Sequence, residues 1–136
     1  MPITTQERKY LKNKHKGGKN NNKGATYENY YATYLIASFT HKYMTQMESV
    51  FLSSQLENAF VDDLLVNETS TLLRTYHQLK DVARLTWRTG KGCSLETDFK
   101  RQMEISNEKG ENFKLKLIYS KTDSPVSSVP NNLSPF

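Results

Sequence analysis

The stretch Asn58–Lys80, NAFVDDLLVNETSTLLRTYHQLK, decides the predicted fold of this chain. It contains two runs with the composition of strands, Ala59–Val66 and Thr71–Lys80. The turn-forming residues Asn67–Thr69 separate the two runs. The stretch therefore predicts a β-hairpin, and the other elements are placed around it.

Polar residues interrupt this hairpin where an apolar strand is expected. Asp62 and Asp63 lie within the first run, and Gln78 and Lys80 share one face of the second because side chains alternate along a strand. An unpaired buried carboxylate is unfavourable by several kcal/mol, roughly, so a partner is expected. Oxygen ligands beside a fixed positive charge indicate a site for a divalent metal ion. The alternative is a solvent-facing acidic pair, or one paired with Arg74.

Length and composition set the broad class. The 136 residues suffice for one domain with a single core. We expect no membrane span, because no run of about 18 apolar residues exists. The polar N-terminus and the single Cys93 predict a cytoplasmic protein in a reducing compartment, without an internal disulfide.

The positive charge is concentrated at the start of the chain. Residues 1–23 contain seven basic residues and one acidic residue, whereas the formal charge of the whole chain is +5. We interpret residues 1–23 as a basic, flexible leader, with a short helical turn over Thr5–Lys14 as an option. Such a leader is either an arm that neutralises nucleic-acid phosphates or a solubilising tail.

The remaining elements follow from periodicity and capping residues. We expect a helix from Thr26 to about Glu48, buried on most sides with its tyrosines in the core, and a strand over Val50–Gln55. A second helix is predicted from the Ser94 cap to Gly110, before a last strand over Phe113–Lys121. The order helix, three strands, helix, strand predicts an α/β fold with a mixed sheet flanked by helices. The domain is placed at 24–121, and the Pro-rich, Ser-rich residues 122–136 are a tail.

Several of these segments resemble a known family. The helix opening GATYENYYATYLI (24–36), the strand FVDDLLV (60–66) and the strand end YHQLK (76–80) resemble the PD-(D/E)XK nuclease superfamily. Together with LTW (85–87) and DF (98–99), they are similar to the double-stranded-DNA endonuclease domain of bacterial antiphage effectors of the CBASS type. The resemblance implies a restriction-endonuclease-like core.

The resemblance also implies roles for individual residues. The metal-binding Asp of the family falls on Asp63, with Asp62 as the alternative, and its second acidic ligand falls on Gln78. The family's lysine falls on Lys80, which would orient the attacking water. Its helix-borne glutamate falls on Glu28, although a carboxylate in a first helical turn is also favoured by the helix dipole. Gln78 departs from the usual acid; its amide oxygen can bind a divalent ion but adds no charge.

The expected function is therefore Mg- or Mn-dependent hydrolysis of double-stranded DNA in antiphage or restriction defence. The alternative is a catalytically inactive nuclease fold that binds nucleic acid or docks a partner. Arg88 and Lys91, beside glycines, either contact DNA phosphates or form an exposed basic loop. His77, on the face opposite Gln78, is expected to be packed in the core. We also expect a homodimer, since two sites facilitate double-strand cleavage, and a separate activating or specificity subunit.

Overall fold

The computed structural model describes residues 2–19, 22–46, 49–81, 85–88 and 94–120. The elements, in chain order, are α1 (Thr5–Lys19), α2 (Asn22–Gln46), β1 (Val50–Ser54), β2 (Leu64–Glu68), β3 (Leu73–Lys80), α3 (Leu95–Glu108) and β4 (Asn112–Tyr119). From α2 onward the order is helix, three strands, helix and strand, so the predicted α/β class is confirmed. The predicted tail at 122–136 lies outside the described residues.

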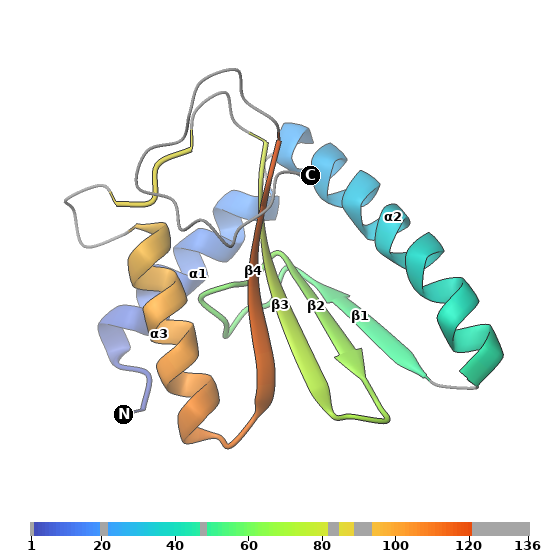
Figure 1. Cartoon of the computed structure of the whole chain (residues 1–136). Helices are drawn as coiled ribbons and strands as arrows, with labels where there is room; N and C mark the ends of the chain where they lie inside the picture. The colour runs from blue at the N-terminus through green and yellow to red at the C-terminus, as the bar shows by residue number, and fades with distance from the viewer. Residues whose placement is uncertain (1, 20–21, 47–48, 82–84, 89–93, 121–136) are drawn as a thin grey trace.

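The strands form one mixed sheet in the order β1-β2-β3-β4 (Figure 1). The first three strands pair antiparallel, whereas β3 and β4 run parallel. Parallel neighbours need a long crossover connection, and α3 lies in it. Leu64 of β2 pairs with His77 of β3. One step further along this register, Asp63 comes opposite Gln78.

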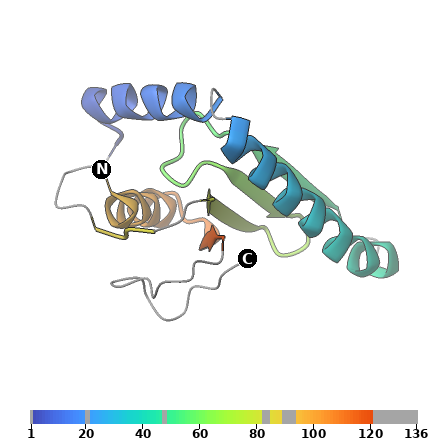
Figure 2. The same cartoon turned by 90° about the horizontal axis from the view of Figure 1, so that it is seen from above.

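Helices cover both faces of the sheet (Figure 2). On one face, Tyr31 and Leu35 of α2 pack with Leu64 and Leu79 of the sheet. On the other face, Phe99 of α3 packs against a cluster of sheet and loop residues: Ala59, Val61, Leu65 and Tyr76. Alternation along β3 therefore directs His77 and Leu79 toward α2 and Tyr76 and Gln78 toward α3.

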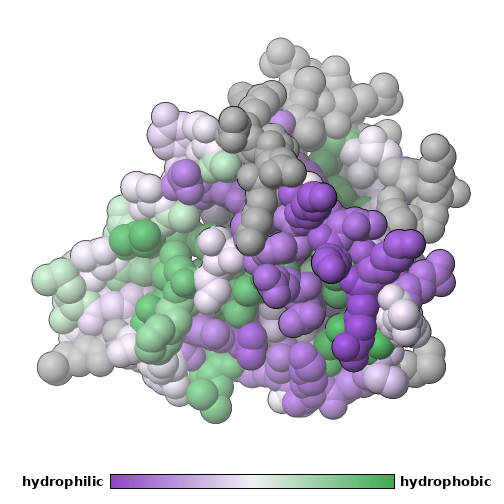
Figure 3. All heavy atoms as spheres, turned by 180° about the vertical axis from the view of Figure 1, so that it is seen from behind, coloured by the Kyte–Doolittle hydropathy of each residue, from purple (hydrophilic) through white to green (hydrophobic). Residues whose placement is uncertain are grey.

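The prediction that α2 is buried on most sides is wrong. The helix begins at Asn22 rather than Thr26, and Tyr30 and Tyr34 are 70% and 53% exposed. Only the stripe through Tyr31 and Leu35 is buried against the sheet. A helix on a single sheet is covered on one side, and its other apolar side chains remain at the surface. Figure 3 shows hydrophobic residues mainly on the left of the view and hydrophilic residues mainly on the right.

Residues 5–19 form α1, although the sequence predicted a flexible leader over 1–23. A capping box starts the helix: the backbone N–H of Thr4 donates to Glu7 Oε2 at 2.9 Å, and that of Glu7 donates to Thr4 Oγ1 at 3.2 Å. Leu11 is buried with Phe60 and with Ile105 of α3. Local capping and one anchored apolar side chain outweigh the polar, basic composition.

The hairpin forms with altered boundaries. β2 begins at Leu64, so Asp62 and Asp63 lie in the segment that precedes the strand rather than inside it. β2 also continues through Glu68, beyond the turn predicted at Asn67–Thr69, and the turn falls at 69–72. Burial of Leu64, Leu65 and Val66 favours extension of this apolar run over an early turn.

The predicted ends of the second helix are confirmed. Ser94 Oγ accepts a hydrogen bond from the N–H of Thr97 at 3.3 Å at the start of α3. Gly110, with a φ of 65°, adopts the left-handed conformation that ends the helix.

In the part of the chain that the structure describes, no helix is both long and apolar enough to cross a membrane.

Candidate functional site

Asp63 is held by the end of β3. Its Oδ2 accepts hydrogen bonds from the backbone N–H of Leu79, at 2.7 Å, and from the Gln78 amide. Asp63 and Gln78 are 8% and 1% exposed, respectively. The pairing of β2 with β3 therefore brings together the two residues that the sequence placed on neighbouring strands.

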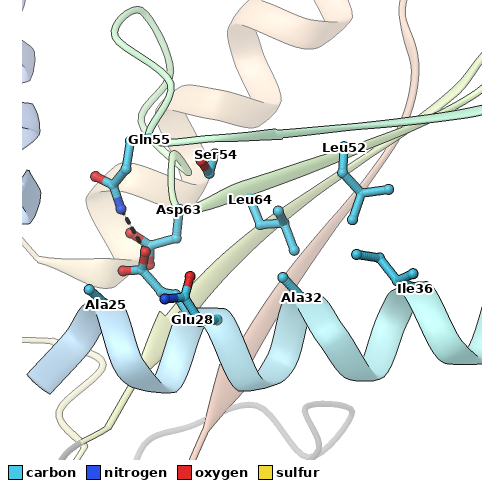
Figure 4. A pocket seen from close by; sticks show the side chains of 10 residues that line it. Ala25, Glu28, Ala32, Ile36, Leu52, Ser54, Gln55, Asp63 and Leu64 are labelled. Atoms are coloured by element: carbon cyan, nitrogen blue, oxygen red, sulfur yellow. Dashed lines mark hydrogen bonds between the residues drawn. The ribbon is translucent and has the colours of Figure 1, made fainter.

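Glu28 reaches the same place from α2. Gln55 Nε2 donates to Glu28 Oε2 at 2.8 Å, and Gln55 follows β1 in a left-handed conformation with a φ of 50°. Figure 4 shows Glu28 and Asp63 directed toward one another across the space between α2 and the sheet. Both line a cavity of about 340 Å³. Its other lining residues are Ala25, Asn29, Ala32, Ile36, Leu52, Ser54, Gln55 and Leu64.

The carboxyl groups around this cavity resist ionisation. Burial, followed by the charge of Asp62, raises the pKa of Asp63 from 3.8 to about 7. Burial also raises the pKa of Glu28 and that of Asp62. Burial therefore disfavours the charged form of these carboxyl groups, and a cation bound beside them would offset that effect.

Lys80 offsets part of the effect of burial on these carboxyl groups. Its positive charge lowers the pKa of Glu28, Asp62 and Asp63 against the effect of burial. The ammonium group of Lys80 thus lies near enough to act on all three carboxyl groups. We refer to Glu28, Asp63 and Lys80 as the open half of the centre.

Lys14 of α1 enters the centre from the other side, and the sequence analysis did not single it out. Its Nζ forms ion pairs with Asp62 Oδ1 at 3.2 Å and with Asp98 Oδ2 at 3.1 Å. It also donates to Gln78 Oε1 at 3.3 Å and to the carbonyl of Phe60. We refer to Lys14, Asp62 and Asp98 as the closed half of the centre.

Asp98 of α3 belongs to this closed half and is 5% exposed. Besides Lys14, it accepts hydrogen bonds of 3.0 Å from Tyr10 Oη at both carboxylate oxygens. The signal for this cluster is present in the sequence: a capping box at Thr4 and Glu7 precedes Tyr10 and Lys14, which share a helical face at a spacing of four. Its significance becomes visible only once α1 lies against α3.

Of the two predicted DNA-contacting residues, Arg88 is described and Lys91 lies outside the described residues. The Arg88 side chain is 70% exposed and forms a double hydrogen bond with Glu96, with Nη2 at 3.0 Å from Oε1. Lys100 contacts the same carboxylate at 2.8 Å. Glu96 therefore neutralises part of the charge that Arg88 would offer to a phosphate.

His77 is packed in the core, as predicted. It is 2% exposed, and its ring centroid lies 5.5 Å from that of Tyr31. Burial and the charge of Lys116 lower the pKa of His77 to about 4. The imidazole is consequently neutral near pH 7 and faces α2, away from Gln78.

The donor set of the open half fits a divalent ion of the hard type. Glu28 and Asp63 offer carboxylate oxygens, which Mg and Mn prefer, at one cavity. Within the described ranges, no three His, Cys, Asp or Glu side chains are grouped tightly enough to form a ready-made metal site. Water or a substrate phosphate would have to supply the remaining ligands.

Comparison of this chain with protein-family models, curated proteins and solved structures gave no match.

Proposed function

We propose that this chain is a metal-dependent endonuclease domain that hydrolyses phosphodiester bonds of double-stranded DNA, in antiphage or restriction defence. The observation that carries the proposal is that Glu28 and Asp63 line one cavity and that the charge of Lys80 lowers the pKa of both carboxyl groups. A divalent-ion position beside a fixed ammonium is what phosphoryl hydrolysis requires.

The topology supports the proposal. An antiparallel three-stranded unit, a crossover helix and a parallel fourth strand agree with the restriction-endonuclease-like core that the sequence resemblance implies. An acid lies just before β2 and a Gln-x-Lys lies at the end of β3, and the proposal assigns these residues to the PD-(D/E)XK motif.

Each residue has a proposed role. Asp63, assisted by Glu28, would hold Mg or Mn near the cavity. Gln78 and Asp62, the other ligands that the resemblance implies, direct oxygen atoms to Lys14 instead. When bound, such an ion supplies positive charge to the phosphoryl oxygens and lowers the pKa of a water molecule. Lys80 would orient that water and stabilise the charge that develops on the phosphate.

The test of this proposal is cleavage of plasmid DNA in Mg or Mn by the wild type and by Lys80→Ala. We expect nicking by the wild type and a loss of at least about a hundredfold in the variant, a typical effect for a positioned catalytic group. Lys109→Ala is the matched control, because Lys109 is exposed at the end of α3 remote from Asp98. Equal cleavage by wild type and Lys80→Ala would exclude the assigned role of Lys80.

A catalytically inactive nuclease fold is the second candidate, and Gln78 favours it. The Gln78 amide is engaged by Lys14 and Asp63 and contributes no negative charge to the centre. Calorimetry with Mn separates the two candidates. A binding site lost in Asp63→Ala supports the enzyme, whereas DNA binding without any ion binding supports the module.

The proposal extends to assembly. Two sites, one for each strand, would come together in a homodimer, and an activating or specificity subunit would restrain the cleavage. Light scattering of the purified chain with and without duplex DNA tests the dimer. A monomer in both conditions would leave only single-strand nicking to this chain.

A further inference from the structure

Lys14 Nζ lies in a cage made only of oxygen atoms. The four contacts come from the Phe60 carbonyl, Asp62 Oδ1, Gln78 Oε1 and Asp98 Oδ2. The contacts to the three side-chain oxygens measure 3.1 to 3.3 Å. These groups belong to the segment before β2, to β3 and to α3. The folded chain thus brings distant segments together around one positive charge.

The cage differs from a surface ion pair. Asp62, Asp98 and Gln78 are 3%, 5% and 1% exposed, and the Lys14 side chain itself is 18% exposed. Two buried carboxylates, a carbonyl and an amide oxygen are the ligands that a hard divalent ion prefers. A single ammonium group here occupies a position suited to such an ion.

The cage is also joined to Asp63. Lysine only donates hydrogen bonds, so the Gln78 atom that faces Lys14 must be its oxygen. The Nε2 of the same amide consequently faces Asp63 Oδ2, which agrees with the observed hydrogen bond. An amide can accept from Lys14 and donate to Asp63 together, whereas a carboxylate cannot.

We propose that Lys14 is a resident cation that takes the place of a second divalent ion in the centre, so that only the open half binds an exchangeable ion. The comparison with a second ion rests on the proposed function, because phosphodiester cleavage often employs two ions. The cage itself is defined by contacts that do not depend on that function. α1 is then part of the site rather than an appended arm.

The test removes the resident cation and offers a soluble one. In Lys14→Ala, we expect the melting temperature to fall by about 10 °C or more, because two buried carboxylates lose their partner. Mn should restore at least half of this loss and should bind with one more ion per chain than in the wild type. The ion needs Asp62 and Asp98 to move inward by about 1 Å to reach bonding distance.

Lys12→Ala is the matched control, since Lys12 is exposed on the same helix. It should melt close to the wild type and gain no ion. In the double variant Lys14→Ala with Asp98→Asn, the additional ion should be lost. In the wild-type background, Asp63→Ala should remove the exchangeable ion of the open half.

These variants distinguish failure of the inference from failure of the proposed function. If the wild type binds no Mn but Lys14→Ala gains an Asp98-dependent ion, the resident cation stands and the endonuclease proposal fails. If Lys14→Ala has the melting temperature of the wild type, the resident cation is excluded. It is also excluded if Mn raises the melting temperature of Lys14→Ala no more than it raises that of the wild type. If Lys14→Ala is unfolded without an ion, its refolding on addition of Mn is the same test, and failure to refold excludes the inference.

Discussion

The closed and open halves of the centre stabilise buried carboxyl groups by different means. In the closed half, Lys14 forms ion pairs with both Asp62 and Asp98. In the open half, amides are the hydrogen-bonding partners: Gln55 contacts Glu28, and Gln78 contacts Asp63. Lys80 acts on the open half through its charge. The closed half thus pairs its carboxylates directly with a cation, whereas the open half holds its carboxyl groups through amides, so that an incoming ion can bind them.

The difference in partners predicts a difference in stability, and this is the largest effect we expect. Lys14→Met should destabilise the protein by about 3–5 kcal/mol, because it leaves two buried carboxylates without their cation. Lys80→Met should cost less than about 1 kcal/mol, because its partners are not direct ion pairs, while it eliminates cleavage. Urea unfolding of both variants measures the contrast. Equal losses of stability would show that the two halves are alike.

Ion binding to the open half should depend on pH. A proton competes with the ion for Asp63. Burial and the charge of Asp62 raise the pKa of Asp63 to about 7. Affinity for Mn should therefore increase by about fiftyfold from pH 5 to pH 7 and level off above about pH 8. Calorimetry across this range measures the change. A flat profile would place the ion on groups other than Asp63.

Replacement of the raised-pKa carboxyl should stabilise the ion-free protein. The folded state binds the Asp63 proton more tightly than the unfolded state, so its contribution to stability is largest at low pH and declines as pH rises from about 4 to about 7. Asp63→Asn should thus gain about 1–2 kcal/mol at pH 8 and close to nothing at pH 4. Thermal unfolding at both pH values without divalent ions checks this. A loss at pH 8 would mean that the hydrogen bonds to Asp63 outweigh its burial.

Arg88 lies outside both halves and should give the smallest change in stability. Arg88→Ala breaks an exposed pair with Glu96, so the urea midpoint of unfolding should stay at the wild-type value. If Arg88 also contacts a DNA phosphate, its loss should reduce the slope of log K for DNA binding against log salt concentration by about one. Fluorescence titrations at several salt concentrations measure the slope. An unchanged slope would assign Arg88 to its intramolecular pair alone.

The hairpin and the second helix show what sequence patterns can determine. Alternation over 73–80 and the apolar run at 64–66 predict neighbouring strands, and the Ser94 cap and Gly110 bound α3. Such signals are local: they depend on side chains a few positions apart along the chain. For the same reason, composition alone misjudged α1, whose stability depends on burial of Leu11 against Phe60 and Ile105.

The residues of the candidate site also differ in whether local sequence or tertiary structure pointed to them. The sequence by itself proposed Asp62, Asp63, Gln78 and Lys80 from their positions on two predicted strands, and the family resemblance added Glu28 as a candidate. Only the tertiary structure brought Lys14 to Asp62 and Asp98, since these residues are separated by long stretches of chain and meet only after α1 packs beside α3. Local periodicity determines where a strand or helix forms, whereas the partner of a buried charge is determined by which segments share the interior.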